Sequence, residues 1–125
     1  YDLDEFKAIN DTYGHSTGDS VLQQTTALVS KALRDTDFHI RLGGEEFLII
    51  MPGVNAEEAH MAMERVRETV AQNPFTEHQL TVTLSSGIAC YVEASGTRLL
   101  DRADKAMYQA KQAGRNRVVI ASSSL

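Results

Sequence analysis

The sequence contains one cysteine, Cys90, and two prolines in 125 residues. A single cysteine excludes an internal disulfide and a zinc site built from several thiolates, so a reducing compartment is expected. No apolar run approaches the roughly 20 residues that span a bilayer, and no charged-then-apolar leader opens the chain. Twelve basic against seventeen acidic residues give a formal charge of −5, which argues against a protein that coats nucleic acid. We expect a cytoplasmic chain, or the cytosolic part of a membrane-bound sensor, that itself contacts neither nucleic acid nor membrane.

The composition that remains is ordinary for one globular domain, with 42% hydrophobic and 23% charged residues. We predict that this domain covers residues 1–121 and that residues 122–125, which are rich in serine, form a flexible tail. The opening residues Tyr1-Asp2-Leu3-Asp4 read as the last residues of a strand that is cut open at its start. The domain is therefore expected to be N-terminally truncated.

Apolar spacing, with capping and breaking residues, predicts the order strand, helix, helix, strand, strand, helix, strand, helix, strand. Gly14 ends the first helix, Thr17 is the expected N-cap of the second, and Asn55 with Glu58 forms a capping box for the third. This alternation indicates a mixed, mainly antiparallel sheet flanked by helices, an α/β sandwich of the ferredoxin-like type. The later boundaries are a hairpin at roughly 37 to 52, strand signals over 80–92, a last helix from Leu99 to Gly114 and a closing strand over Arg117–Ile120.

The pentapeptide Gly43-Gly44-Glu45-Glu46-Phe47 places two glycines beside two acids. Gly-Gly accepts the positive φ angles of a two-residue hairpin turn, and it leaves room for a ligand to touch the backbone. Paired carboxylates next to bare backbone suit a phosphate and its metal. Surface turns are often acidic for purely structural reasons, so the pentapeptide alone leaves both interpretations open.

Asp2 and Asp4 lie two residues apart and share one face of a strand. If Glu45 and Glu46 come close to the end of that strand, a hard divalent cation such as Mg²⁺ would relieve the repulsion. For Asp4 alone we favour the simpler role of N-cap of the first helix. Asp2 has no such alternative.

Several cations and polar residues leave two interpretations each. Lys111 and Arg115 either pair with a helix dipole, which we favour for these residues alone, or clamp a triphosphate, with Lys7 as a third partner. Asn10 and Asp19 either cap helices or bind a base edge. Simple solvated surface charge is the first interpretation of Arg34, Asp37, Arg65 and Arg67, and no chemistry is assigned to Cys90, His15, His39, His60 or His78.

Four separated motifs, taken together and in order, resemble a GGDEF domain, the diguanylate cyclase family, in a GGEEF variant of the signature. They are Asp2-Leu3-Asp4-x-Phe6-Lys7-x-Ile9-Asn10-Asp11, Gly14-His15-x-x-Gly18-Asp19, Arg41-x-Gly43-Gly44-Glu45-Glu46-Phe47 and Ala103-Asp104-x-Ala106-Met107-Tyr108-x-Ala110-Lys111-x-x-Gly114-Arg115-Asn116. The resemblance implies a palm-type cyclase sandwich. It also implies that two GTP molecules condense into cyclic di-GMP with release of pyrophosphate, each GTP being held by one subunit of a homodimer.

The resemblance further implies roles for individual residues. Asp2, the Leu3 carbonyl and Glu45 would hold Mg²⁺, two ions per active site, or Mn²⁺, and Glu46 would bind metal or activate the attacking hydroxyl. Which glutamate is the base stays open. The guanine edge would be bound by Asn10 and Asp19, and the phosphates would approach the backbone of Gly43 and Gly44. Phosphate charge would be balanced by Lys7, Lys111 and Arg115. An inhibitory product site would be formed by Arg34, Asp37 and Arg65.

The resemblance also implies a sensor or receiver domain before this segment in the full-length protein. Two other classes of function compete with catalysis. A non-catalytic receptor would bind GTP or cyclic di-GMP and pass the signal to a partner, and an inert module would serve only dimerisation.

Overall fold

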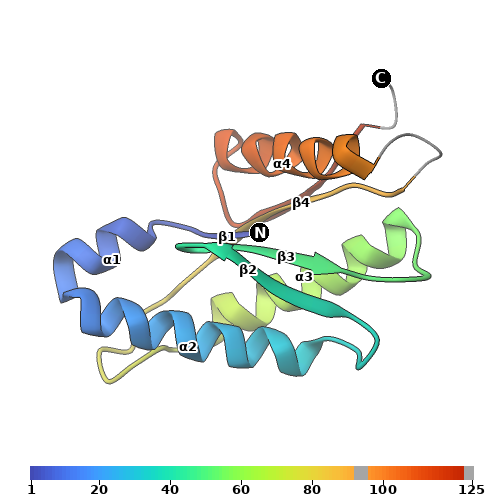
Figure 1. Cartoon of the computed structure of the whole chain (residues 1–125). Helices are drawn as coiled ribbons and strands as arrows, with labels where there is room; N and C mark the ends of the chain where they lie inside the picture. Colours follow the sequence, from blue (N-terminus) through green and yellow to red (C-terminus); the bar gives the residue numbers. More distant parts are fainter. Residues whose placement is uncertain (92–95, 123–125) are drawn as a thin grey trace.

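The computed structural model describes residues 1–91 and 96–122, without the side chains of residues 96 and 97. Its elements follow the predicted order (Figure 1). They are β1 (Asp2–Leu3), α1 (Phe6–Tyr13), α2 (His15–Ala32), β2 (Phe38–Gly43), β3 (Glu46–Ile50), α3 (Ala56–Gln72), β4 (Leu84–Ile88), α4 (Gly96–Gln112) and β5 (Arg117–Ile120).

The five strands form one sheet in the order β2-β3-β1-β4-β5. The pairs β2–β3, β3–β1 and β1–β4 are antiparallel, and only β4–β5 is parallel. In Figure 1, α4 lies above the sheet, and α2 and α3 lie below it. The prediction of a mixed, mainly antiparallel sheet flanked by helices is confirmed.

The core lies between the sheet and the helices below it. Helix α3 buries Ala59, Met63, Val66 and Val70, the apolar face that its spacing predicts, and Asn55 and Glu58 form the predicted capping box at its start. On the other face of the sheet, α4 packs tightly on β4, because a Cβ added at Gly87 would overlap the backbone of Ala103 and Met107. Gly87 therefore sets the height of α4 above the sheet.

Two predicted boundaries are wrong. The N-cap of α1 is Glu5, not Asp4, and it has a left-handed backbone (φ 57°) with no side-chain cap hydrogen bond. Helix α2 begins at His15, so Thr17 lies inside it, because Gly14 already provides the turn between α1 and α2. The signals over 80–92 favoured one kinked strand or two short ones; in the described part of this range the strand covers Leu84–Ile88, and Leu80 pairs with Phe75 in an isolated bridge.

Some predictions fall at the edges of the described residues. Val92 and the tail residues 123–125 lie outside them. Helix α4 begins at Gly96, three residues before the apolar signal at Leu99, and its C-terminal end before Gly114 agrees with the sequence. Among the described residues, no helix has the length and apolar character needed to cross a membrane.

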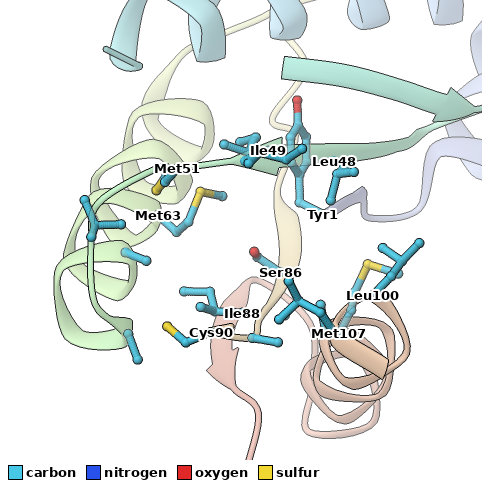
Figure 2. Close-up of a pocket in the computed structure, with 18 of the residues that line it drawn as sticks. Tyr1, Leu48, Ile49, Met51, Met63, Ser86, Ile88, Cys90, Leu100 and Met107 are labelled. Atoms are coloured by element: carbon cyan, nitrogen blue, oxygen red, sulfur yellow. The ribbon is translucent and has the colours of Figure 1, made fainter. Parts of the chain in front are cut away.

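An apolar groove of about 1050 Å³ opens between β3 and β4. Tyr1, which exchanges backbone hydrogen bonds with Phe47 of β3, is part of its lining. Figure 2 shows side chains from both strands, from α3 and from α4 around the groove, among them Leu48, Met63 and Leu100. The groove is continuous with the strand that carries Asp2.

Candidate active site

The glycine turn lies at the tip of the β2–β3 hairpin. Gly43 pairs with Glu46 after a register shift beyond Arg41, so the two turn residues are Gly44 and Glu45. The turn is therefore displaced by one residue from the Gly43-Gly44 pair that the sequence favoured. Positive φ angles occur at Gly43 (153°) and Gly44 (52°), and a Cβ on either glycine would meet only open space. The Arg41 Nε donates to the Gly44 carbonyl (2.9 Å), and both glycines present bare backbone to the outside.

The hairpin acids lie beside β1, an arrangement that the sequence left open. The Leu3 amide donates to the Glu45 carbonyl (3.2 Å), and the Phe47 amide donates to the Tyr1 carbonyl (2.8 Å). Asp2 is directly opposite Glu46 in the antiparallel register, which places both carboxylates on the same face of the sheet. Two like charges in this position repel each other, so this face favours a cation.

Lys111 supplies one such cation. Its Nζ donates to Asp2 Oδ2 at 2.5 Å, and the side chain of Asp2 is only 10% exposed. The lysine comes from the last turn of α4, which Gly87 holds close to the sheet. A residue that the sequence offered for a phosphate is thus paired, in this structure, with a residue that the sequence offered for a metal.

The oxygen donors predicted for Mg²⁺ lie close together where β1 meets the β2–β3 hairpin. Among the described residues no group of three or more acidic, histidine or cysteine side chains forms a ready-made metal cluster. The chemistry of the donors still fits a hard divalent cation, because Asp2 and Glu46 face each other across the ladder and Glu45 follows Gly44 in the turn. The structure therefore brings together Asp2, Leu3, Glu45 and Glu46, with Gly43 and Gly44 adjacent.

The end of α4 carries the second predicted phosphate cation, Arg115. The Arg115 amide donates to the Ala110 carbonyl (3.0 Å) and the Gly114 amide to the Lys111 carbonyl (3.3 Å), the two bonds of a Schellman motif. Arg115 Nε lies 3.4 Å from Glu5 Oε1, in an exposed pair. The guanidinium thus lies beside the start of α1.

Asn10, Asp19 and Lys7 lie on the α1–α2 pair. Gly18 is buried in α2, and a Cβ there would overlap Asn10 Oδ1 and come within 3.3 Å of Phe6 Cζ. Because Gly18 has no side chain, the Asn10 carboxamide can pack against α2 at Gly18, directly before Asp19. Lys7 and Asp19 are exposed, while Asn10 is partly buried.

Arg34 and Asp37 form a close pair at the start of β2. The guanidinium donates to Asp37 Oδ1 from Nε (3.1 Å) and from NH2 (2.6 Å), and the Arg34 amide donates to Oδ2 (2.8 Å). These hydrogen bonds from Arg34 lower the pKa of Asp37 below its usual range. Arg65 is exposed on α3, and no hydrogen bond or ion pair in the described part of the chain joins it to Arg34 or Asp37.

Three residues have partners that sequence reasoning missed. Asp4 accepts hydrogen bonds from β4 and from the turn before β5. Arg67 is not simple surface charge, since it binds Glu64 (2.9 Å) and Asn116 Oδ1 (2.9 Å).

His39, to which no chemistry was assigned, lies between the Tyr1 hydroxyl (2.7 Å) and Ser30 Oγ (3.0 Å). Burial lowers the pKa of His39. Glu64 lies only three residues before Arg67 on α3, but the other partners come from other segments of the chain, so local spacing carried no signal for them.

Comparison with known proteins places these features in a family. A family model described as "Diguanylate cyclase, GGDEF domain" matches residues 1–117. Diguanylate cyclase DgcP of Pseudomonas aeruginosa is 41% identical over 123 residues, covering 96% of this chain and 18% of that protein. Response regulator PleD of Caulobacter vibrioides is 43% identical over 124 residues, covering 94% of this chain and 27% of that protein. The chain thus spans a third or less of these relatives.

Solved structures agree with the sequence matches. The active GGEEF domain of a diguanylate cyclase from Vibrio cholerae superimposes with a TM-score of 0.88 at 34% identity, covering 98% of this chain and 80% of that one. The GGDEF domain of DgcB from Caulobacter crescentus, in complex with c-di-GMP, gives a TM-score of 0.89 at 34% identity, covering 98% and 75%. The likeness includes nearly every described element.

Proposed function

Because the chain belongs to the GGDEF diguanylate cyclase family, we propose that it is the catalytic domain of an enzyme that condenses two GTP molecules into cyclic di-GMP. The observation that carries the proposal is that Asp2 lies opposite Glu46, next to the open backbone of Gly43 and Gly44. Acidic residues and bare backbone at one place provide for both a metal and the phosphates that it neutralises. A hairpin turn with no ligand would need neither.

In the proposed reaction, the 3′-oxygen of one GTP bonds to the α-phosphorus of the other. The bond from that phosphorus to the bridging oxygen breaks, and pyrophosphate leaves. The same step in the opposite direction closes the ring. Since each molecule attacks the other, the proposal places one GTP on each subunit of a homodimer.

The residues divide this work by their position. Asp2, the Leu3 carbonyl and Glu45 would hold Mg²⁺, or Mn²⁺, with two ions in each site, and such ions neutralise phosphate charge and lower the pKa of a coordinated hydroxyl. Either Glu45 or Glu46 accepts the proton of the 3′-hydroxyl. Gly43 and Gly44 admit the α- and β-phosphates. Charge on the leaving phosphates is balanced by Lys7, Lys111 and Arg115, and the guanine edge is read by Asn10 and Asp19.

Lys111 makes a contact that the residue types alone did not suggest. Its ammonium neutralises Asp2 in the structure, at 2.5 Å. An ammonium has three N–H donors, so Lys111 could bind a phosphate with one of them and keep Asp2 with another. The contact with Lys111 compensates the charge of the buried Asp2 carboxylate.

Turnover tests the proposal directly. The full-length protein, incubated with GTP and Mg²⁺, should release pyrophosphate and form cyclic di-GMP. Glu45→Gln and Glu46→Gln should each reduce kcat by about 10²-fold or more, because each removes a metal ligand or a base. The matched control is Glu57→Gln, an exposed residue in the first turn of α3, which should turn over normally. A wild-type protein that binds cyclic di-GMP tightly without turnover is a receptor, and one that binds neither nucleotide is only a dimerisation module.

We also propose that the product inhibits the enzyme at Arg34, Asp37 and Arg65. The support is the Arg34–Asp37 pair, in which two guanidinium N–H groups donate to Asp37 Oδ1 and hold the guanidinium in a fixed orientation on the surface. Arg34→Ala should raise the inhibition constant for cyclic di-GMP by about tenfold or more, while Lys31→Ala, a nearby exposed cation at the end of α2, should not. An unchanged inhibition constant in Arg34→Ala would show that the product binds elsewhere.

The location and domain context of the full-length protein are proposed on the same basis. A cytoplasmic domain fits a reaction that consumes GTP. Relatives such as Response regulator PleD are three or more times longer than this chain, which supports a sensor or receiver domain in the same polypeptide. Mass determination and sequencing of the natural protein test this directly.

A further inference from the structure

Asp4 is a buried carboxylate that joins three segments of the chain. It is 5% exposed, and it follows β1 directly. Its Oδ2 accepts from Thr83 Oγ1 (2.7 Å) and from the Asn116 amide (3.0 Å), and its Oδ1 accepts from Ser85 Oγ (2.7 Å). The Asp4 amide donates to the Thr83 carbonyl (2.9 Å) as well. Strand β1, strand β4 and the turn before β5 therefore meet at one side chain.

The turn that Asp4 holds has an unfavourable backbone. Arg115 (φ 64°) and Asn116 (φ 46°) are consecutive left-handed residues, a conformation that residues with a Cβ rarely adopt. Such a conformation persists only where its surroundings fix it. Here the Schellman bonds fix the start of the turn, and the carboxylate of Asp4 binds the Asn116 amide at its end. Arg67 binds the Asn116 side chain from the opposite side.

The contacts of Asp4 are unlike those of Asp2. Both oxygens of Asp4 already accept from hydroxyl and amide donors, and little of the residue is exposed. Asp2, two residues earlier, has a lysine as its partner and lies opposite Glu46. Asp4 is therefore placed to orient other residues, not to touch a metal or a nucleotide.

We propose that Asp4 is a positioning residue for the triphosphate clamp. It locks the Gly114–Asn116 turn against β1, and so it fixes Arg115 at the end of α4 relative to the strand that carries Asp2. The proposal rests on the assignment of Arg115 to phosphate binding. Its consequence is selective: loss of Asp4 should weaken binding of the phosphates and leave binding of the base, which lies on the α1–α2 pair, unchanged.

Two binding probes separate this role from simple structural support. Magnesium tripolyphosphate reports the clamp and guanosine reports the base site, each titrated calorimetrically into the full-length protein. Asp4→Ala should weaken tripolyphosphate by about tenfold or more, because a charge-assisted hydrogen bond is lost, with guanosine affinity unchanged. The matched control, Asp101→Ala on the exposed side of α4, should change neither affinity.

Asp4→Asn serves as the variant of similar shape. An amide oxygen in place of Oδ2 can still accept from Thr83 and Asn116, and the Ser85 hydroxyl can turn to accept from the amide nitrogen. This variant should fold and should lose about threefold in tripolyphosphate affinity, since the bond to the Asn116 amide is no longer charge-assisted. If Asp4→Ala does not fold, Asp4→Asn alone decides the question by the same two probes.

A double-mutant cycle with Arg115→Ala completes the test. If Asp4 acts through Arg115, either Asp4 variant should have little further effect on tripolyphosphate binding in the Arg115→Ala protein. Equal losses in both backgrounds, or equal losses for guanosine and tripolyphosphate, would overturn the proposal. A wild-type protein that does not bind tripolyphosphate would refute the clamp and the role of Asp4 with it, whereas formation of cyclic di-GMP is measured separately and tests the proposed function itself.

Discussion

Gly18→Ala should change nucleotide selectivity with little effect on stability. The added Cβ would overlap Asn10 Oδ1 and approach Phe6 Cζ at 3.3 Å. Asn10 carries the overlapping atom at the end of a flexible side chain, so its carboxamide rotates away from α2. Phe6 needs to move by only a few tenths of an ångström. The substitution therefore displaces the Asn10 side chain from the proposed guanine site and leaves the core packed.

The magnitudes follow from these contacts. Alanine replaces glycine inside a helix with a gain of about 0.5–1 kcal/mol, which offsets the crowding at Phe6. The free energy of unfolding should therefore change by less than about 1 kcal/mol. If Asn10 binds the base as proposed, its displacement costs a hydrogen bond of about 0.5–1.5 kcal/mol, which lowers kcat/KM for GTP by up to about tenfold. Inosine triphosphate, which lacks the exocyclic amino group of guanine, should be affected less if Asn10 binds that group.

The assay combines urea denaturation with kcat/KM for both nucleotides in the full-length protein. Asn10→Ala should reproduce the loss for GTP, and adding Gly18→Ala to Asn10→Ala should then change nothing, because the overlapping atom is gone. The reasoning fails if Gly18→Ala loses more than about 2 kcal/mol of stability, since the crowding would then lie in the core. It also fails if the loss persists in the Asn10→Ala background.

Two further predictions concern stability. Gly87→Ala should destabilise the fold by about 1–3 kcal/mol in urea denaturation, because its Cβ would overlap the backbone of Ala103 and Met107, which cannot rotate aside as Asn10 can; a change as small as that of Gly18→Ala would contradict the tight packing of α4. The lowered pKa of His39 means that the folded state binds a proton less readily than the unfolded state, so stability should fall as the pH drops below the ordinary histidine value of 6.5. His39→Gln should reduce the difference in urea midpoint between about pH 7.5 and about pH 5.5, and an equal difference in both proteins would place the pH dependence in other groups.

Local patterns were sufficient for the elements and for the hairpin. The capping box at Asn55 and the break at Gly114 act over a few residues, and the structure confirms both. The hairpin around Gly43 also forms, with its turn one residue later than the Gly43-Gly44 pair. The position of Asp4 before α1 also suits an N-cap, while the partners of its carboxylate, Thr83, Ser85 and Asn116, are 79 to 112 residues away. A tertiary contact of that separation leaves no trace in local spacing.

In the candidate site, too, local patterns predicted some features, and others depend on contacts between distant segments. The sequence placed Asp2 and Asp4 on one face of a strand by alternation, and it left open whether the hairpin acids would come close to them. It did not predict that Lys111 would bind Asp2, 109 residues away, or that the turn would centre on Gly44 and Glu45. The first depends on how closely α4 approaches the sheet at Gly87, and the second on a register shift that no single residue specifies.

Strand β2 lies between the proposed product site at Asp37 and the glycine turn of the proposed active site. Asp37 stands just before the strand, and Gly43 closes it. Because successive residues of a strand point to opposite faces, one inserted residue would break the register of β2 with β3 and turn the side chains on one side of the insertion to the opposite face. The glycine turn itself is held at β1 by the hydrogen bond from the Leu3 amide to the Glu45 carbonyl. Exposed side chains such as Phe38 and Ile40 can change without breaking the register. The number of residues in β2 is thus under a stricter physical constraint than their identity, and insertions or deletions there should be tolerated less well than substitutions.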